Sequence, residues 1–152
     1  SYDKRDALHL DRLQLLGNLA LTAGIDPPDM NEWMWANFVD AAEWVMLPNV
    51  LGMALFADGG LMSTKPYASG GAYINRMSDF CKTCKYDPKK RTGSDACPFT
   101  TLYWDFLDRN KKILGKNHRL SRQLGGLNRL KDLESTRKRA KEVLTLLDNG
   151  EL

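Results

Sequence analysis

The sequence predicts an all-α fold, a helical bundle of about six helices with no convincing strand. Apolar residues recur at helical spacing in several segments of the 152-residue chain. Prolines stand where helices are expected to begin, at Pro27-Pro28 and Pro98, and Gly24 stands where one is expected to end. The hydrophobic content of 43% suits a single globular helical domain, which we expect to include residues 1–152.

The first half is expected to hold two helices, over residues 4–23 and from Asp26 to about Val45. The second of these is apolar nearly all round, which is typical of a buried helix, so we interpret its tryptophans Trp33, Trp35 and Trp44 as core residues. Buried tryptophans in series can also carry electrons to a cofactor. Leu47-Pro48-Asn49 is expected to end this helix, and Asp58-Gly59-Gly60 to form a turn.

The second half is expected to hold three further helices. Ser69-Gly70-Gly71 is interpreted as a flexible approach to a helix that leads to Cys81. A second helix is predicted over residues 98–114. Gly125-Gly126 is expected to separate a short arginine-rich stretch from a basic amphipathic helix over about residues 127–147.

Charge is unevenly divided along the chain, although its net charge is only +3. Residues 1–58 carry nine acidic side chains, whereas residues 109–141 carry twelve lysines and arginines against Asp132 and Glu134. This division indicates a polyanion or an acidic protein as the partner of the second half, or else a solvated basic helical face. No apolar run is long enough to span a membrane.

All three cysteines lie within residues 79–104, in the pattern Cys81-x2-Cys84-x12-Cys97-Pro98. A two-residue gap lets two thiolates reach one metal centre from a single turn. The proline after the third cysteine can open a helix. The polar residues 85–95 cannot form a core, but they can cover a cluster. We therefore predict that this segment binds a metal or a cluster.

The spacing alone leaves the nature of the site open. A disulfide is disfavoured because the count is odd and nothing marks secretion. Zinc needs a fourth ligand, and neither His9 nor His118 stands at the usual spacing. An iron–sulfur cluster needs a fourth thiolate, and three buried structural thiols are the simplest alternative. Since the sequence starts at Ser1 without a methionine, we expect a fourth cysteine upstream or on a partner.

Roughly residues 8 to 130 resemble the iron–sulfur bacterial branch of the photolyases and cryptochromes, which includes the photolyase-related proteins and the prokaryotic (6-4) photolyases. The resemblance rests on the three cysteines and on runs of residues that include Leu47-Pro48-Asn49-Val50, Phe56-Ala57-Asp58-Gly59-Gly60, Thr64-Lys65-Pro66-Tyr67, Tyr73-Ile74-Asn75-Arg76-Met77 and Cys97-Pro98-Phe99. It concerns only the C-terminal part of the family's helical FAD-binding domain.

The resemblance implies a function in light-driven repair of DNA photoproducts or in blue-light sensing. It implies a [4Fe–4S] cluster held by Cys81, Cys84 and Cys97 with a fourth ligand outside this segment, and FAD if the rest of the flavin domain is present. It places Trp33, Asp40, Asn49 and Met53 near the flavin and His9, Tyr67 and Tyr73 near the lesion. DNA is then the partner, and Arg76, Lys89, Lys90 and Arg91 are candidate phosphate contacts.

Several residues depart from the family pattern: Leu8 stands in place of a histidine, Met46 of a glutamate, Met34 of an aromatic residue and Leu51 of a histidine. Loss of the first two removes proton-transfer groups, so we do not expect this chain alone to repair DNA. The alternative is a non-catalytic iron–sulfur subunit with a structural or electron-transfer role in a larger photosynthetic or redox assembly. In either case we expect a cytoplasmic protein in bacteria, or an organellar one in eukaryotes.

Overall fold

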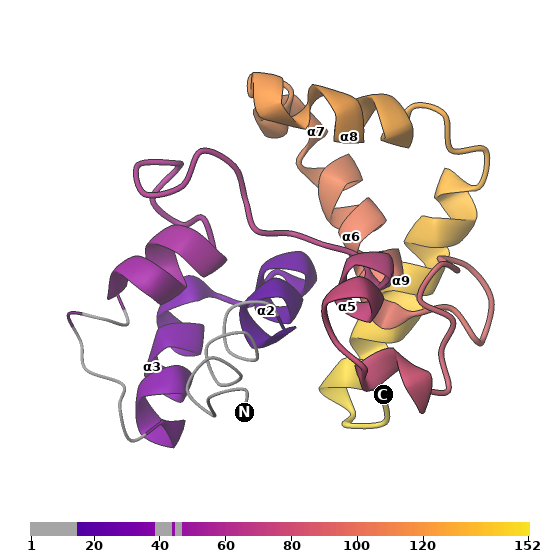
Figure 1. Cartoon of the computed structure of the whole chain (residues 1–152), viewed down its shortest axis with the longest axis horizontal. Coiled ribbons are helices and arrows are strands. Elements are labelled where there is room, and N and C mark those ends of the chain that lie inside the picture. The colour runs from indigo at the N-terminus through magenta and orange to yellow at the C-terminus, as the bar shows by residue number, and fades with distance from the viewer. Residues whose placement is uncertain (1–14, 39–43, 45–46) are drawn as a thin grey trace. The chain divides into compact units, whose positions relative to one another are not determined.

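The computed structural model describes residues 15–38, 44 and 47–152 of the chain (Figure 1). Helices dominate these residues, and no strand occurs among them. An isolated backbone bridge joins Asp87 to Ala96. The predicted all-α fold is confirmed. No helix within the described ranges is long and apolar enough to cross a membrane.

The chain forms two compact units, Ser1–Ala68 and Ser69–Leu152. The single helical domain over residues 1–152 stays a prediction.

The first unit contains helices α2 (Asn18–Ala23) and α3 (Pro27–Asn37) and the π-helix η2 (Leu47–Ala54). α2 ends at Gly24, whose left-handed backbone (φ 86°) lets its N–H reach the carbonyl of Ala20. α3 begins with two prolines, which need no hydrogen-bond partner in a first turn. α3 packs against η2, and the core between these elements is made by Ala20, Met30, Met34, Val50 and Leu55.

Two expectations for the second helix are wrong. The helix ends at Asn37, where Phe38 turns to an extended backbone, and does not continue to Val45. Its tryptophans are not core residues, because Trp33, Trp35 and Trp44 are 47%, 52% and 80% exposed. The buried positions of α3 belong to the methionines Met30 and Met34. Unbranched methionine fills an irregular gap more easily than an indole ring does.

Leu47-Pro48-Asn49 begins the π-helix η2, whereas the sequence predicted that it would end a helix. Proline fits the first turn because the N–H that it lacks has no partner within the helix there. The Asp58-Gly59-Gly60 turn is confirmed. The Asp58 carboxylate accepts the N–H of Gly60 (2.9 Å) and of Met62 (2.8 Å), and both glycines have positive φ. These bonds lower the pKa of Asp58.

The second unit is built on α6 (Pro98–Arg109) and α9 (Leu133–Asp148), which pack against each other (Figure 1). Leu102, Leu107 and Val143 are almost completely buried. α5 (Gly71–Met77) contacts α6 and leads into the short 3₁₀ helix η3 (Phe80–Lys82). Beyond α6 the chain continues through α7 (Lys111–Leu114), η4 (His118–Leu120) and α8 (Ser121–Leu127).

Helix boundaries in this unit differ from the prediction. The helix expected over residues 98–114 is interrupted at Asn110, whose side-chain amide donates to the carbonyl of Phe106 (2.9 Å). Gly125 and Gly126 lie inside α8, where burial of neighbouring leucines outweighs the low helix propensity of glycine. The last helix therefore begins at Leu133 and not near residue 127.

Candidate functional site

The three cysteines lie in the second unit around the start of α6. Cys81 belongs to η3, Cys84 follows it, and Cys97 directly precedes Pro98, the first residue of α6. All three thiols are free; Cys97 is buried, Cys81 is half-buried and Cys84 is exposed. The expectation that Pro98 opens a helix beside the third cysteine is confirmed.

The three sulfur atoms share one neighbourhood. Burial raises the pKa of the Cys81 thiol, and the nearby Cys97 and Cys84 raise it further because neighbouring thiolates repel each other. Cysteines separated along the chain thus interact electrostatically through space. Only the thiolate binds a metal, so loading this site would release protons.

The described residues contain no group of three histidine, cysteine or acidic side chains that could hold a single metal ion. A tetrahedral zinc site would need sulfur atoms about 2.3 Å from one central ion. An iron–sulfur cluster takes its thiolates on different iron atoms, so its ligands stand farther apart.

Gly71 allows the Cys97 sulfur to approach the beginning of α5. A Cβ atom at this position would lie only 2.5 Å from Sγ of Cys97, and 3.1 Å from both the Pro88 carbonyl and Oγ1 of Thr100. The N–H of Gly71 donates to Oγ1 of Thr100 (2.9 Å), and that hydroxyl donates to the carbonyl of Pro88 (2.7 Å). The expected flexible approach is wrong at this residue, since Gly71 is buried and tied to α6.

The polar segment between Cys84 and Cys97 is held by hydrogen bonds to its own backbone and to both long helices. The N–H of Asp87 donates to the carbonyl of Asp95 (2.8 Å). The hydroxyl of Thr101, on α6, donates to the carbonyl of Arg91 (2.9 Å). Nε of Arg91 donates to both carboxylate oxygens of Asp132 (3.0 and 2.9 Å), at the start of α9. The segment is therefore an ordered part of the second unit.

The candidate phosphate contacts have different surroundings. Arg76 is exposed on α5, and its guanidinium lies over the ring of Tyr73, 5.4 Å from the centroid. Lys89 is exposed, and Lys90 forms an ion pair with Asp95. Arg91 forms its ion pair with Asp132. Two of the four side chains thus already have an acidic partner within this unit.

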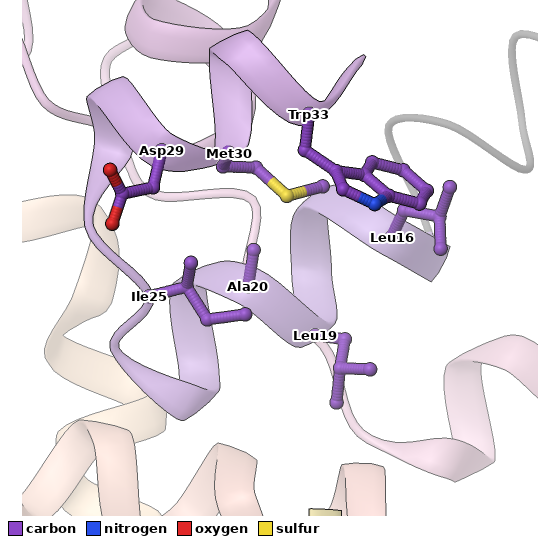
Figure 2. A pocket seen from close by; sticks show the side chains of 7 residues that line it. All are labelled: Leu16, Leu19, Ala20, Ile25, Asp29, Met30 and Trp33. Carbon is purple, nitrogen blue, oxygen red and sulfur yellow. The ribbon is translucent and has the colours of Figure 1, made fainter. Parts of the chain in front are cut away.

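The candidate flavin residues lie in the first unit. Trp33 belongs to α3, while Asn49 and Met53, both half-buried, lie on the adjacent η2. Trp33 also lines an apolar cavity of about 330 Å³. Figure 2 shows its indole ring beside Leu16, with Asp29 as the acidic residue of the lining. Asp40 lies outside the described residues.

The candidate lesion-site residues are spread over both units. Tyr67 is 49% exposed in the first unit, and Tyr73 is half-buried on α5 of the second. His9 lies outside the described residues, as do the departures Leu8 and Met46. The remaining departures are described: Met34 is buried and Leu51 is half-buried against the core of the first unit.

Sequence reasoning missed three residues that contact the cysteine segment: Gly71, Thr100 and Asp132. Each contributes through a contact with a residue distant in sequence; Gly71 and Thr100, for example, are 29 positions apart. No local pattern marks such contacts. Pairing the lone acidic residues of a basic stretch with basic residues of the cysteine segment could have suggested Asp132.

Comparison with known proteins supports the resemblance. No family model matches the chain. A (6-4) photolyase of Agrobacterium fabrum is 60% identical over 115 residues, which are 76% of this chain and 23% of that protein. An uncharacterized protein of Acanthamoeba polyphaga mimivirus is 38% identical over 86 residues, which are 57% of this chain and 63% of that protein. The chain thus spans less than a quarter of the photolyase that it matches, in that protein's C-terminal region.

Proposed function

Because this chain is related to the photolyase family over 115 of its residues, we propose that it is the cluster-bearing part of a photolyase-like flavoprotein of DNA repair or blue-light sensing. The observation that carries the proposal is that Cys81, Cys84 and Cys97 lie near one another in a segment that is hydrogen-bonded to α6 and α9. The identity to a (6-4) photolyase over the greater part of the chain gives this arrangement its context.

Cys81, Cys84 and Cys97 would supply three of the four thiolates of a [4Fe–4S] cluster, with the fourth outside this segment. Such a cluster supplies one-electron redox chemistry and a rigid cross-link between the segments that bind it. The protein's own part is to hold the thiolates: η3 presents Cys81, and the residue before α6 presents Cys97. Burial of Cys97 keeps its sulfur out of water.

The cluster proposal is tested by purifying the chain without oxygen and assaying iron and acid-labile sulfide. We expect both, together with a brown colour that Cys84→Ser removes. Cys84 is exposed, so serine should remove a ligand with little effect on packing, and circular dichroism should confirm that the helices persist. Stoichiometric zinc without sulfide would contradict the proposal and favour a structural zinc site.

The flavin would need more than these residues. Trp33 is exposed, and Asn49 and Met53 are half-buried on a neighbouring helix, so the first unit offers one wall of a site. We therefore expect that these 152 residues alone do not retain FAD or repair DNA. Stoichiometric flavin after purification, or light-dependent repair of a (6-4) lesion, would contradict this expectation.

DNA is the proposed partner, with Arg76 and Lys89 as its first candidate contacts because both are exposed. Phosphate contacts release counterions, so affinity for a labelled duplex should fall with salt by a log–log slope of about −0.9 per contact. Lys89→Glu should flatten that slope by about one contact. Lys65→Glu, an exposed lysine of the first unit, serves as a control of equal charge change.

A non-catalytic subunit remains the second candidate function. It is favoured by the internal ion pairs of Lys90 and Arg91, which give these residues a role in holding the cysteine segment. The exposed tryptophans of the first unit also favour a protein partner. Absence of duplex binding even at low salt, in a preparation that contains iron and sulfide, would support this candidate over the repair function.

A further inference from the structure

We propose that Gly71 and Thr100 are positioning residues that fix the Cys97 sulfur relative to Cys81. The inference rests on the proposed function, since it assigns these two residues to the geometry of the proposed cluster. α5, α6 and the cysteine segment approach one another closely at one point. That point lies beside the most deeply buried of the three sulfur atoms.

Gly71 leaves room for the sulfur of Cys97. Gly71 has no side chain, and a Cβ atom there would lie 2.5 Å from Sγ of Cys97. Real Cβ atoms do not approach other heavy atoms this closely, so the sulfur or the helix would have to move. The backbone of Gly71 is helical, and its φ is not positive. The need for glycine therefore arises from the room that the sulfur takes.

Thr100 joins three segments of the chain through a pair of hydrogen bonds. The Thr100 hydroxyl accepts from the N–H of Gly71 and donates to the carbonyl of Pro88, at 2.9 and 2.7 Å. One buried side chain thus joins the first residue of α5, the first turn of α6 and the segment between Cys84 and Cys97. Valine in its place would leave a buried N–H and a partly buried carbonyl without this partner.

The other end of α5 leads toward Cys81. The helix is followed by hydrogen bonds from the N–H of Ser78 to Ile74 (2.9 Å) and from that of Lys82 to Asp79 (3.0 Å). α5, whose first residue Gly71 lies beside Cys97, ends at the extended residue Ser78, and η3, which contains Cys81, contacts α5. Because α5 contacts both α6 and η3, a shift of α5 at Gly71 would change the separation of the two thiolates. Mutation of an outer residue that orients a metal ligand commonly lowers metal affinity by about 10- to 100-fold.

The test compares the rate of cluster loss in an iron chelator, followed by the visible absorbance of the full 152-residue chain. Thr100→Val and Gly71→Ala should lose the cluster about tenfold faster than the unmodified protein. Thr100→Ser, which keeps the hydroxyl, should behave as the unmodified protein does. Thr22→Val is the matched control, since it removes another buried threonine hydroxyl, bonded to the Asn18 carbonyl (2.8 Å) and remote from the cysteines in sequence.

Two further measurements distinguish a positioning role of Thr100 at the cluster from a general contribution to protein stability. Without the cluster, Thr100→Val and Thr22→Val should lower the thermal unfolding temperature of the protein by similar amounts. With the cluster bound and reduced, only Thr100→Val should change the electron paramagnetic resonance spectrum. Cluster loss at the unmodified rate in Thr100→Val would overturn the inference, even if Gly71→Ala does not fold. If the unmodified chain contains no iron and sulfide, the proposed function fails first and this inference fails with it.

Discussion

The two units of the chain bury their large side chains to different degrees. In the second unit, Leu102, Leu107 and Val143 are buried almost completely between α6 and α9. In the first unit, Trp33 and Trp44 are 47% and 80% exposed. A large exposed aromatic surface commonly marks a site of interaction with other protein. The comparison indicates that α6 and α9 of the second unit enclose a core, while the described tryptophans of the first unit present apolar surface for a partner.

The largest effect is expected from breaking the core of the second unit. Leu102 is 0% exposed, so Leu102→Ala should leave a cavity between α6 and α9 and lower the free energy of unfolding by about 3 kcal/mol. Urea denaturation monitored by circular dichroism measures this change. Ile113→Ala is the control, because Ile113 is 70% exposed and its truncation should cost much less.

Glycine substitutions should act in opposite directions in the two units. Gly59 has a φ of 70° and Gly125 lies inside α8, and a Cβ atom at either position would meet nothing within 4 Å. Gly59→Ala should destabilise the protein by about 1 kcal/mol, since alanine disfavours left-handed backbone. Gly125→Ala should stabilise it by about 0.5–1 kcal/mol through helix propensity. The same sign for both would contradict this account.

A smaller effect is expected from the ion pair that joins the cysteine segment to α9. The side chains of Arg91 and Asp132 are both about one-third exposed (31% and 33%), so solvent screens their attraction. A double-mutant cycle with Arg91→Ala and Asp132→Ala should give a coupling energy of about 0.5 kcal/mol that decreases with salt. The pair of Lys90 with Asp95, about half exposed, is the control and should show no measurable coupling.

The smallest effect is expected at the exposed indole of the first unit. Trp44 is 80% exposed, so Trp44→Ala should change the free energy of unfolding of the isolated chain by less than about 0.5 kcal/mol. The same substitution should weaken binding to a protein partner if this surface is an interface. A loss of several kcal/mol in the isolated chain would show that the indole belongs to the core after all.

The sequence by itself determined the features that depend on neighbouring residues. Helical spacing predicted the all-α fold, Cys97-Pro98 predicted the start of α6, and Asp58-Gly59-Gly60 predicted a turn. The motifs also indicated the resemblance to photolyases, which the identity to a bacterial (6-4) photolyase confirmed. These signals are local because proline, glycine and side-chain caps act on the backbone within a few positions.

Tertiary structure alone decided which apolar side chains are buried and what surrounds the cysteines. Periodicity could not tell that Met34 would be buried and Trp35 exposed, because that depends on the elements packed against α3. Nor could it show that Gly71 would meet the Cys97 sulfur, or that Arg91 would pair with Asp132. Such contacts join residues distant in sequence, and the packing of whole helices brings them together.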